Sequence, residues 1–111
     1  MTYAKKEVFT TDLQEIAAFA KVLAHPARLA ILDYIAGQNQ CISGDITSEI
    51  PLSRTTVSQH LQELKNAGLI HGTVSGTRVF YCLETEKIQA LKTRMHDFME
   101  KLAESQTQCT I

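Results

Sequence analysis

The chain has 111 residues, of which 44% are hydrophobic and 21% are charged. This composition is typical of a folded globular protein, so residues 1–111 are expected to form a single domain, with a flexible tail at about 105–111. The formal net charge of −1 excludes a protein that attracts polyanions through overall basic charge. No apolar run approaches the roughly 20 residues of a membrane span. Residues 1–10 carry no export signal, so a cytoplasmic location is expected.

The first part of the chain predicts two helices. Thr11 and Gln14 have the spacing of a capping box, and apolar residues then recur at helical intervals, so a helix is expected from Thr11. The dipeptide His25-Pro26 ends it. Pro26 is suited to the first position of the next helix, because its missing N–H would be unpaired there. Gly37 is expected to terminate this second helix in the left-handed conformation.

The middle of the chain predicts two further helices and a hairpin. A short helix is expected at about Ser43 to Ile50, and Ser53 caps the next one, whose inner face is the i, i+4, i+7 set that starts at Val57. The period then changes from 3.6 to 2. Leu69–Val74 and Thr77–Leu83 are two strand-like runs on either side of a tight turn, which is typical of a β-hairpin.

Thr85 is expected to cap a last helix whose apolar residues form a heptad seam. The intervals alternate between three and four residues, at Ile88, Leu91, Met95, Phe98 and Leu102. The first helix has a similar seam at Leu13, Ile16, Ala20 and Leu23. The predicted order is therefore ααααββα, an α+β and mainly helical fold with the arrangement of a winged helix-turn-helix.

The helix capped by Ser53 carries the strongest functional signal. Its first two turns offer hydrogen-bonding side chains and no acid, at Arg54, Thr55, Thr56, Ser58, Gln59 and His60. Such side chains suit a helix in the DNA major groove, where arginine reads guanine, glutamine reads adenine, and serine or threonine meets phosphates or base edges. Arg78 follows the hairpin turn, where it is expected to reach a phosphate or the minor groove. The sequence thus predicts binding to double-stranded DNA through Ser53 and these residues.

Three stretches resemble the ArsR/SmtB family of small bacterial repressors that respond to metals and metalloids. They are AHPARLAIL (Ala24 to Leu32), LSRTTVSQHLQELKNAGLI (Leu52 to Ile70) and GTRVFYCL (Gly76 to Leu83). The resemblance implies a homodimer through the first and last helices, and a repressor that releases operator DNA when an inducer ion binds. An enzyme is not expected, because no nucleophile motif, phosphate-binding glycine loop or HExxH motif accompanies the cysteines and histidines.

The two inducer sites that the resemblance implies differ from the residues present here. The places of the metal ligands on the last helix are taken by Thr85, Lys87, Phe98 and Lys101. Neither lysine nor phenylalanine is a metal ligand, so that site is absent. The arsenic-type Cys-x-Cys motif is replaced by Cys41-Ile42-Ser43-Gly44-Asp45. Trivalent arsenic and antimony require soft thiolates, and the Ser43 hydroxyl is not one.

Cys109 in the tail is the first hypothesis for the missing sulfur, because packing gives no reason for a cysteine there. Cys41 and Cys109 would then bind As(III) or Sb(III) as inducer, while DNA binding itself requires no cofactor. A second hypothesis is a redox- or persulfide-responsive repressor that uses a reversible disulfide between the same residues. A third is a regulator of this fold with no metal site. Cys82 is interpreted as a small residue packed in the hairpin.

Overall fold

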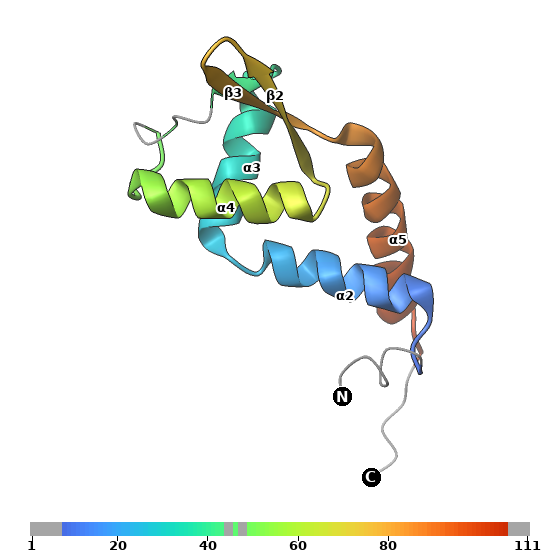
Figure 1. The fold of residues 1–111 in the computed structure, drawn as a ribbon. Coiled ribbons are helices and arrows are strands. Elements are labelled where there is room, and N and C mark those ends of the chain that lie inside the picture. The colour runs from blue at the N-terminus through green and yellow to red at the C-terminus, as the bar shows by residue number, and fades with distance from the viewer. Residues whose placement is uncertain (1–7, 44–45, 47–48, 107–111) are drawn as a thin grey trace.

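The computed structural model describes residues 8–43, 46 and 49–106, in which four helices lie around a small antiparallel sheet (Figure 1). In chain order the elements are α2 (Thr11–Leu23), α3 (Pro26–Gln38), β1 (Ile42–Ser43), α4 (Arg54–Asn66), β2 (Ile70–Ser75), β3 (Arg78–Leu83) and α5 (Thr85–Ala103). The strand order in the sheet is β1-β3-β2. The predicted α+β, mainly helical class is confirmed. In these residues no helix combines the length and the apolar character that crossing a membrane requires.

The helix α2 begins at Thr11 as predicted, but the residue that caps it is Thr10. Thr10 has an extended backbone, and its hydroxyl accepts a hydrogen bond from the N–H of Leu13 at 3.3 Å. The side chain of Gln14 donates to the carbonyl oxygen of Phe9 at 2.8 Å. The capping box predicted at Thr11 is therefore wrong by one residue, because Thr11 already lies within the helix.

The helix α3 begins at Pro26, as the sequence predicts. The ring nitrogen Nδ1 of His25 accepts a hydrogen bond from the N–H of Ala27 at 3.3 Å and so caps this helix. Its end differs from the prediction. The left-handed residue is Asn39, with φ of 55°, whereas Gly37 lies inside the helix. Asparagine adopts this conformation more readily than most residues, so the helix extends one residue beyond Gly37.

A strand occupies the start of the predicted third helix. That helix was expected at about Ser43–Ile50, but Ile42–Ser43 form β1 and pair with β3. Among the described residues of the segment, Glu49 and Ile50 both donate their N–H groups to the carbonyl oxygen of Ile46, which makes a single turn. The prediction is wrong at Ser43 because a two-residue strand has no period of its own and forms only through its partner strand.

The helix α4 and the hairpin follow the prediction closely. Ser53 caps α4, and β2 pairs with β3 in a register that runs from Ile70 opposite Leu83 to Ser75 opposite Arg78. Gly76 opens the two-residue loop of the hairpin with φ of 65°, a value that glycine adopts without steric cost and that a type II′ turn requires. The hairpin is the wing of the fold, and it stands beside α4 (Figure 1).

The core is aliphatic and joins the helices to the sheet. Its buried members are Ile31, Ile35, Ile42, Ile46, Ile50, Val57, Leu61, Leu64, Leu69, Ile70 and Leu91. Leu91 is only 4% exposed, so the first half of the seam predicted on α5 belongs to the core of the same chain. An ion pair between Arg94 and Glu15 also holds α5 to α2. The end of α5 differs, because Met99 and Leu102 remain 54% and 55% exposed.

The cap of α5 is Glu84 and not Thr85, which is already helical. The side chain of Glu84 makes no capping hydrogen bond. Instead, its Oε1 atom lies 2.9 Å from the ring nitrogen Nδ1 of His71 on β2. The start of α5 is thereby tied to the wing.

Candidate DNA-binding surface and thiol pair

Four of the residues predicted to contact DNA lie exposed on the first two turns of α4. They are Arg54, Thr55, Ser58 and Gln59. Ser53 and Thr56 are engaged in the cap. The Ser53 hydroxyl accepts a hydrogen bond from the Thr56 N–H at 3.2 Å and donates one to the Thr56 hydroxyl at 2.9 Å. These two residues therefore fix the start of the helix, and the other four form its outer surface.

His60 does not share this surface, and the prediction that it contacts DNA is wrong. It is only 8% exposed, its ring packs edge-on against His25, and its Nδ1 accepts a hydrogen bond from Nε of Arg28 at 3.3 Å. Burial, followed by the charges of His25 and Arg28, lowers the pKa of His60 below its ordinary value of 6.5. Helical spacing explains the position, because Val57 and Leu64, three residues before and four after, are both buried.

A groove of about 480 Å³ lies between α4 and the wing. It is lined by Ser43, Arg54, Ser58, Leu61, Arg78, Val79 and Tyr81. Arg54 comes from the helix and Arg78 from the first position of β3, so two guanidinium groups that are distant in sequence border the same groove. A guanidinium binds phosphate through paired hydrogen bonds, so this groove suits a nucleic-acid backbone.

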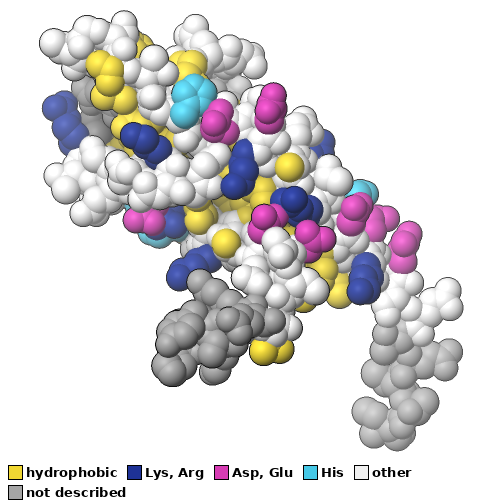
Figure 2. Space-filling view, turned by 45° about the vertical axis from the view of Figure 1, so that its right-hand side comes forward, with side chains coloured by type: hydrophobic (Ala, Val, Ile, Leu, Met, Phe, Trp, Pro, Cys, Tyr) yellow, Lys and Arg dark blue, Asp and Glu magenta, His cyan; other side chains and the backbone are white. Residues whose placement is uncertain are grey.

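The face of the molecule drawn in Figure 2 is not generally basic. Figure 2 shows one face of the molecule, on which basic and acidic side chains are interspersed and apolar side chains appear between them. This pattern agrees with the net charge of −1. Overall charge therefore gives no attraction to DNA, and the groove between α4 and the wing offers a local pair of basic residues, Arg54 and Arg78.

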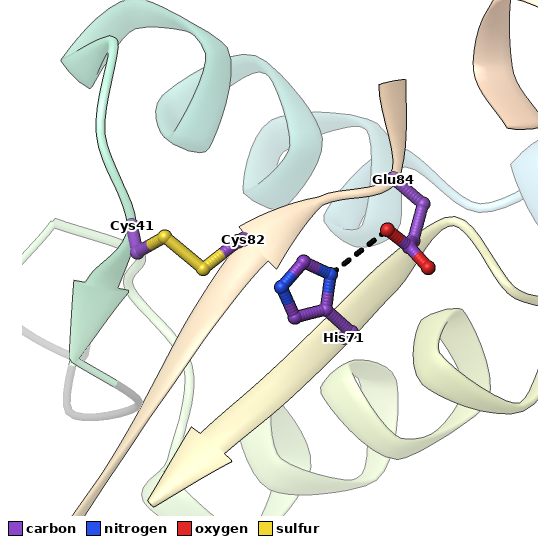
Figure 3. Close-up of polar contacts among 4 residues, drawn as sticks. All are labelled: Cys41, His71, Cys82 and Glu84. Atoms are coloured by element: carbon purple, nitrogen blue, oxygen red, sulfur yellow. Dashed lines mark hydrogen bonds and ion pairs between the residues drawn. A yellow bond between two sulfur atoms is a disulfide. The ribbon is translucent and has the colours of Figure 1, made fainter. Parts of the chain in front are cut away.

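The cysteines Cys41 and Cys82 form a disulfide across the sheet (Figure 3). Their Cα atoms lie 4.4 Å apart. The register that pairs Ile42 with Tyr81 brings these cysteines opposite each other one position further along. Interpreting Cys82 as only a packed strand residue is therefore wrong. Cys41 is bonded to it, and Cys109, the partner predicted for Cys41, lies outside the described residues.

A cavity gives small molecules access to the disulfide. It measures about 370 Å³ and is lined by Ile35, Ala36, Asn39, Gln40, Cys41, Cys82, Leu83 and Thr85. Cys41 is exposed and Cys82 is half-buried. Both sulfur-bearing residues are therefore placed where a dissolved oxidant or reductant can reach them.

The cysteines do not belong to a ready-made metal centre within the described part of the chain. There, no three side chains of histidine, cysteine, aspartate or glutamate gather into a possible metal site. The arsenic or antimony site predicted at Cys41 and Cys109 stays a prediction, because Cys109 falls outside these residues.

Comparisons with known proteins identify the family. Residues 23–73 match the model of a helix-turn-helix domain. The HTH-type transcriptional regulator YgaV of Escherichia coli is 32% identical over 78 residues, which cover 70% of this chain and 79% of that protein. The chain belongs to the ArsR/SmtB family of winged-helix transcriptional regulators. It is thus a DNA-binding regulator of transcription, and the prediction that it is not an enzyme is confirmed by these relatives.

A further relative and two solved structures are also similar to this chain. The cadmium resistance transcriptional regulatory protein CadC of Listeria innocua is 28% identical over 99 residues, covering 89% of this chain and 83% of CadC. The homodimeric winged helix-turn-helix DNA-binding domain of Mb0332 from Mycobacterium bovis is 28% identical with a TM-score of 0.62, covering 88% and 90%. An ArsR-like regulator from Rhodococcus sp. RHA1 has a TM-score of 0.72 over 85% and 88% of the two chains. At 18% identity it shows the fold alone.

Proposed function

We propose that this ArsR/SmtB protein is a sequence-specific repressor whose affinity for operator DNA is set by the thiol or disulfide state of Cys41 and Cys82. The position of the disulfide carries the proposal. It joins the residue before β1 to the wing strand β3. Ser43 of β1 and Arg78 of β3 both line the groove beside α4. A bond that forms or breaks at this point therefore acts on the groove that would hold DNA.

The DNA contacts follow from exposure. Ser58 and Gln59 would reach base edges in the major groove, while Arg54 and Arg78 would hold the phosphate backbone on either side of the groove. Thr55 lies on the same exposed turn. An operator in double-stranded DNA as partner would place the protein in the cytoplasm.

A homodimer would supply a second copy of the DNA-contacting helix α4. Met99 and Leu102 near the end of α5, and Leu13 on α2, are large apolar side chains that this chain leaves exposed. The two helices that carry these residues pack on each other. A second copy docked there would cover them, and two copies of α4 would then read two half-sites about one helical turn apart.

Oxidation of the two cysteines by hydrogen peroxide balances without any other group from the protein. Two thiols and one peroxide molecule give one disulfide and two molecules of water. The reduced protein, in which β1 and β3 are joined only by their short ladder, is the form proposed to bind the operator. The disulfide fixes the wing strand to β1 and is proposed to favour release.

The test compares operator affinity in the two states. A labelled fragment of the promoter upstream of the protein's own gene is titrated with reduced and with peroxide-oxidised protein, and mass spectrometry confirms the Cys41–Cys82 bond. We expect the reduced protein to bind about 5- to 150-fold more tightly, the usual range of coupling between two sites. Binding should weaken steeply with salt, because each neutralised phosphate releases counterions.

Two variants serve as matched controls. The Cys41→Ser/Cys82→Ser variant should bind as tightly as the reduced protein whether or not peroxide is present. Cys109→Ser should keep the response. Equal affinity of the reduced and oxidised wild-type protein would refute the switch, and a response lost in Cys109→Ser but kept in Cys82→Ser would move it to the pair predicted from the sequence.

A thiophilic ion is the second candidate inducer. The disulfide shows that the sulfurs of Cys41 and Cys82 can meet, so after reduction they offer two soft ligands to As(III) or Sb(III), with Cys109 as the candidate third. CadC, a relative named for cadmium resistance, also supports this candidate. Arsenite, antimonite and cadmium added to the reduced protein–operator complex test it. Release by an ion in the absence of oxidant, lost in Cys41→Ser, would favour ion sensing over redox sensing.

A further inference from the structure

His71 and Glu84 lie on the side of Cys82 opposite Cys41 (Figure 3). His71 on β2 is the direct cross-strand partner of Cys82 on β3. Directly paired residues of an antiparallel sheet point to the same face, with their Cβ atoms about 4.5–5.5 Å apart. Nδ1 of His71 lies 2.9 Å from Oε1 of Glu84, and the other ring nitrogen, Nε2, lies on the side of the ring that faces the disulfide.

The residues around the sulfur of Cys82 include few ionisable side chains. The cavity wall that α3 contributes is uncharged, being formed by Ile35, Ala36, Asn39 and Gln40. The start of α5 contributes Thr85. Glu84 is the ion-pair partner of His71 in the described part of the chain. Among the described residues that line this cavity or pair with Cys82, the ionisable side chains are therefore Cys41 from the β1 side, His71 from β2, and Glu84 through His71.

We infer that in the reduced protein His71 accepts the proton of the Cys82 thiol, with Glu84 holding the imidazole in place. Cys82 is then the sulfur that reacts first with an oxidant, and Cys41 is the sulfur that resolves the product. The inference rests on the proposed function, since it assumes that the reduced pair is a working state. Imidazole suits this role because it gains and loses a proton near neutral pH, and a thiolate beside a protonated imidazole is stabilised.

The steps balance with hydrogen peroxide as the oxidant. The Cys82 thiolate attacks one peroxide oxygen, the O–O bond breaks, and the departing hydroxide takes the proton held on His71, giving sulfenic acid and water. The Cys41 sulfur then attacks the sulfur of this sulfenic acid. The S–S bond forms, and the hydroxyl group leaves as a second water with the proton from Cys41.

The experiment measures the reactivity of Cys82 alone. In a Cys41→Ser/Cys109→Ser background Cys82 is the sole thiol of the full chain, and its alkylation by iodoacetamide is followed from pH 5 to 10. Replacing His71 by Asn should lower the rate at pH 7 roughly tenfold and move the half-maximal rate to higher pH. Glu84→Gln should give a smaller change in the same direction. This substitution spares α5, because Glu84 makes no capping hydrogen bond.

The exposed His96 on α5 provides the matched control. His96→Asn should leave both the rate and the pH profile unchanged. An unchanged pH profile in His71→Asn would overturn the inference. That outcome is separate from failure of the proposed function, which is measured on wild-type protein as the difference in operator affinity between the reduced and oxidised states. Circular dichroism of each variant confirms that a changed profile comes from a folded protein.

Discussion

Arg28 donates a hydrogen bond from Nε to Nδ1 of His60 across 3.3 Å, and so ties the start of α3 to the middle of α4. The same guanidinium donates from a terminal nitrogen to the carbonyl oxygen of Val22 at 3.3 Å, just before α2 ends. One side chain thus joins three helices. The orientation of α4, on which any reading of DNA depends, is set partly by this contact.

Replacing His60 by Ala should destabilise the fold while leaving the exposed side chains of α4 unchanged in kind. The partly buried guanidinium of Arg28 would lose one of its two acceptors, at a cost of about 1 kcal/mol in the free energy of unfolding. Urea unfolding measures this loss. Gln59→Ala on the exposed face is the control and should change the unfolding free energy by less than about 0.5 kcal/mol. Equal stability of the two variants would contradict the buried role of His60.

The lowered pKa of His60 predicts a pH dependence of stability. Because the pKa is lower in the folded protein than its ordinary value of 6.5, the unfolded chain binds a proton more readily. The contribution is complete above about pH 6.5 and declines as the pH falls through 6.5 towards the lowered pKa. Burial is the main cause of the lowered pKa, the charges of His25 and Arg28 lower it further, and Glu63 opposes them. In His60→Ala the decline between pH 7 and 5 should be shallower than in the wild type.

Substitutions on the exposed face of α4 should distinguish base contacts from phosphate contacts. Ser58→Ala and Gln59→Ala are each expected to weaken operator binding by about 1–3 kcal/mol while changing binding to random DNA little. Arg78→Ala should weaken both kinds of DNA alike and reduce the salt slope by about one unit. Fluorescence anisotropy at several salt concentrations measures both effects. Equal losses on operator and random DNA for Gln59→Ala would show that it only positions the backbone.

Reduction of the disulfide should lower stability. The two cysteines are 41 positions apart, and the chain-entropy model gives about 4 kcal/mol for a closed loop of this length. Urea unfolding with and without a phosphine reductant measures the difference. Cys82→Ser should behave like the reduced protein, and Cys109→Ser like the oxidised wild type. Identical unfolding curves for reduced and oxidised protein would contradict the prediction.

The two halves of α5 should respond differently to an introduced charge. Leu102→Glu places charge on an exposed apolar residue and is expected to dissociate the dimer while each subunit stays folded. Leu91→Glu places charge in the core of the chain and should unfold the subunit itself. Sedimentation measures the mass of each variant, and circular dichroism its folding. A Leu102→Glu protein that remains dimeric would remove the end of α5 from the interface.

Local signals in the sequence were sufficient for much of the fold. Pro26 and Ser53 have preferences that act within one helical turn, and Gly76 allows the tight turn of the wing, so each fixes a boundary without help from distant residues. The strand β1 is different. Its two residues acquire their conformation by pairing with β3, some 38 residues further along. No local repeat of apolar residues in the sequence indicates this pairing.

The site was predictable where exposure follows from helical spacing and not where it depends on a neighbouring helix. Ser58 and Gln59 lie well away from the buried stripe of α4. His60 lies at its edge, and only the approach of Arg28 from α3 turns a polar residue inward. The bond between Cys41 and Cys82 was not predicted because β1, whose pairing with β3 brings the two cysteines together, was not predicted. Once β1 is paired, the register alone brings the two cysteines together.

The disulfide divides the chain into the segment between Cys41 and Cys82, called the interval, and the segments before and after it, called the flanks. α4, β2 and the turn of the wing all lie between Cys41 and Cys82 in sequence, whereas α2, α3 and α5 lie outside. Residues that would determine operator specificity therefore lie in the interval, and residues that would determine the partner subunit lie in the flanks. Mutations that retarget one choice need not disturb the other, so related regulators in one cell could diverge in operator preference while keeping, or separately losing, the ability to pair with each other.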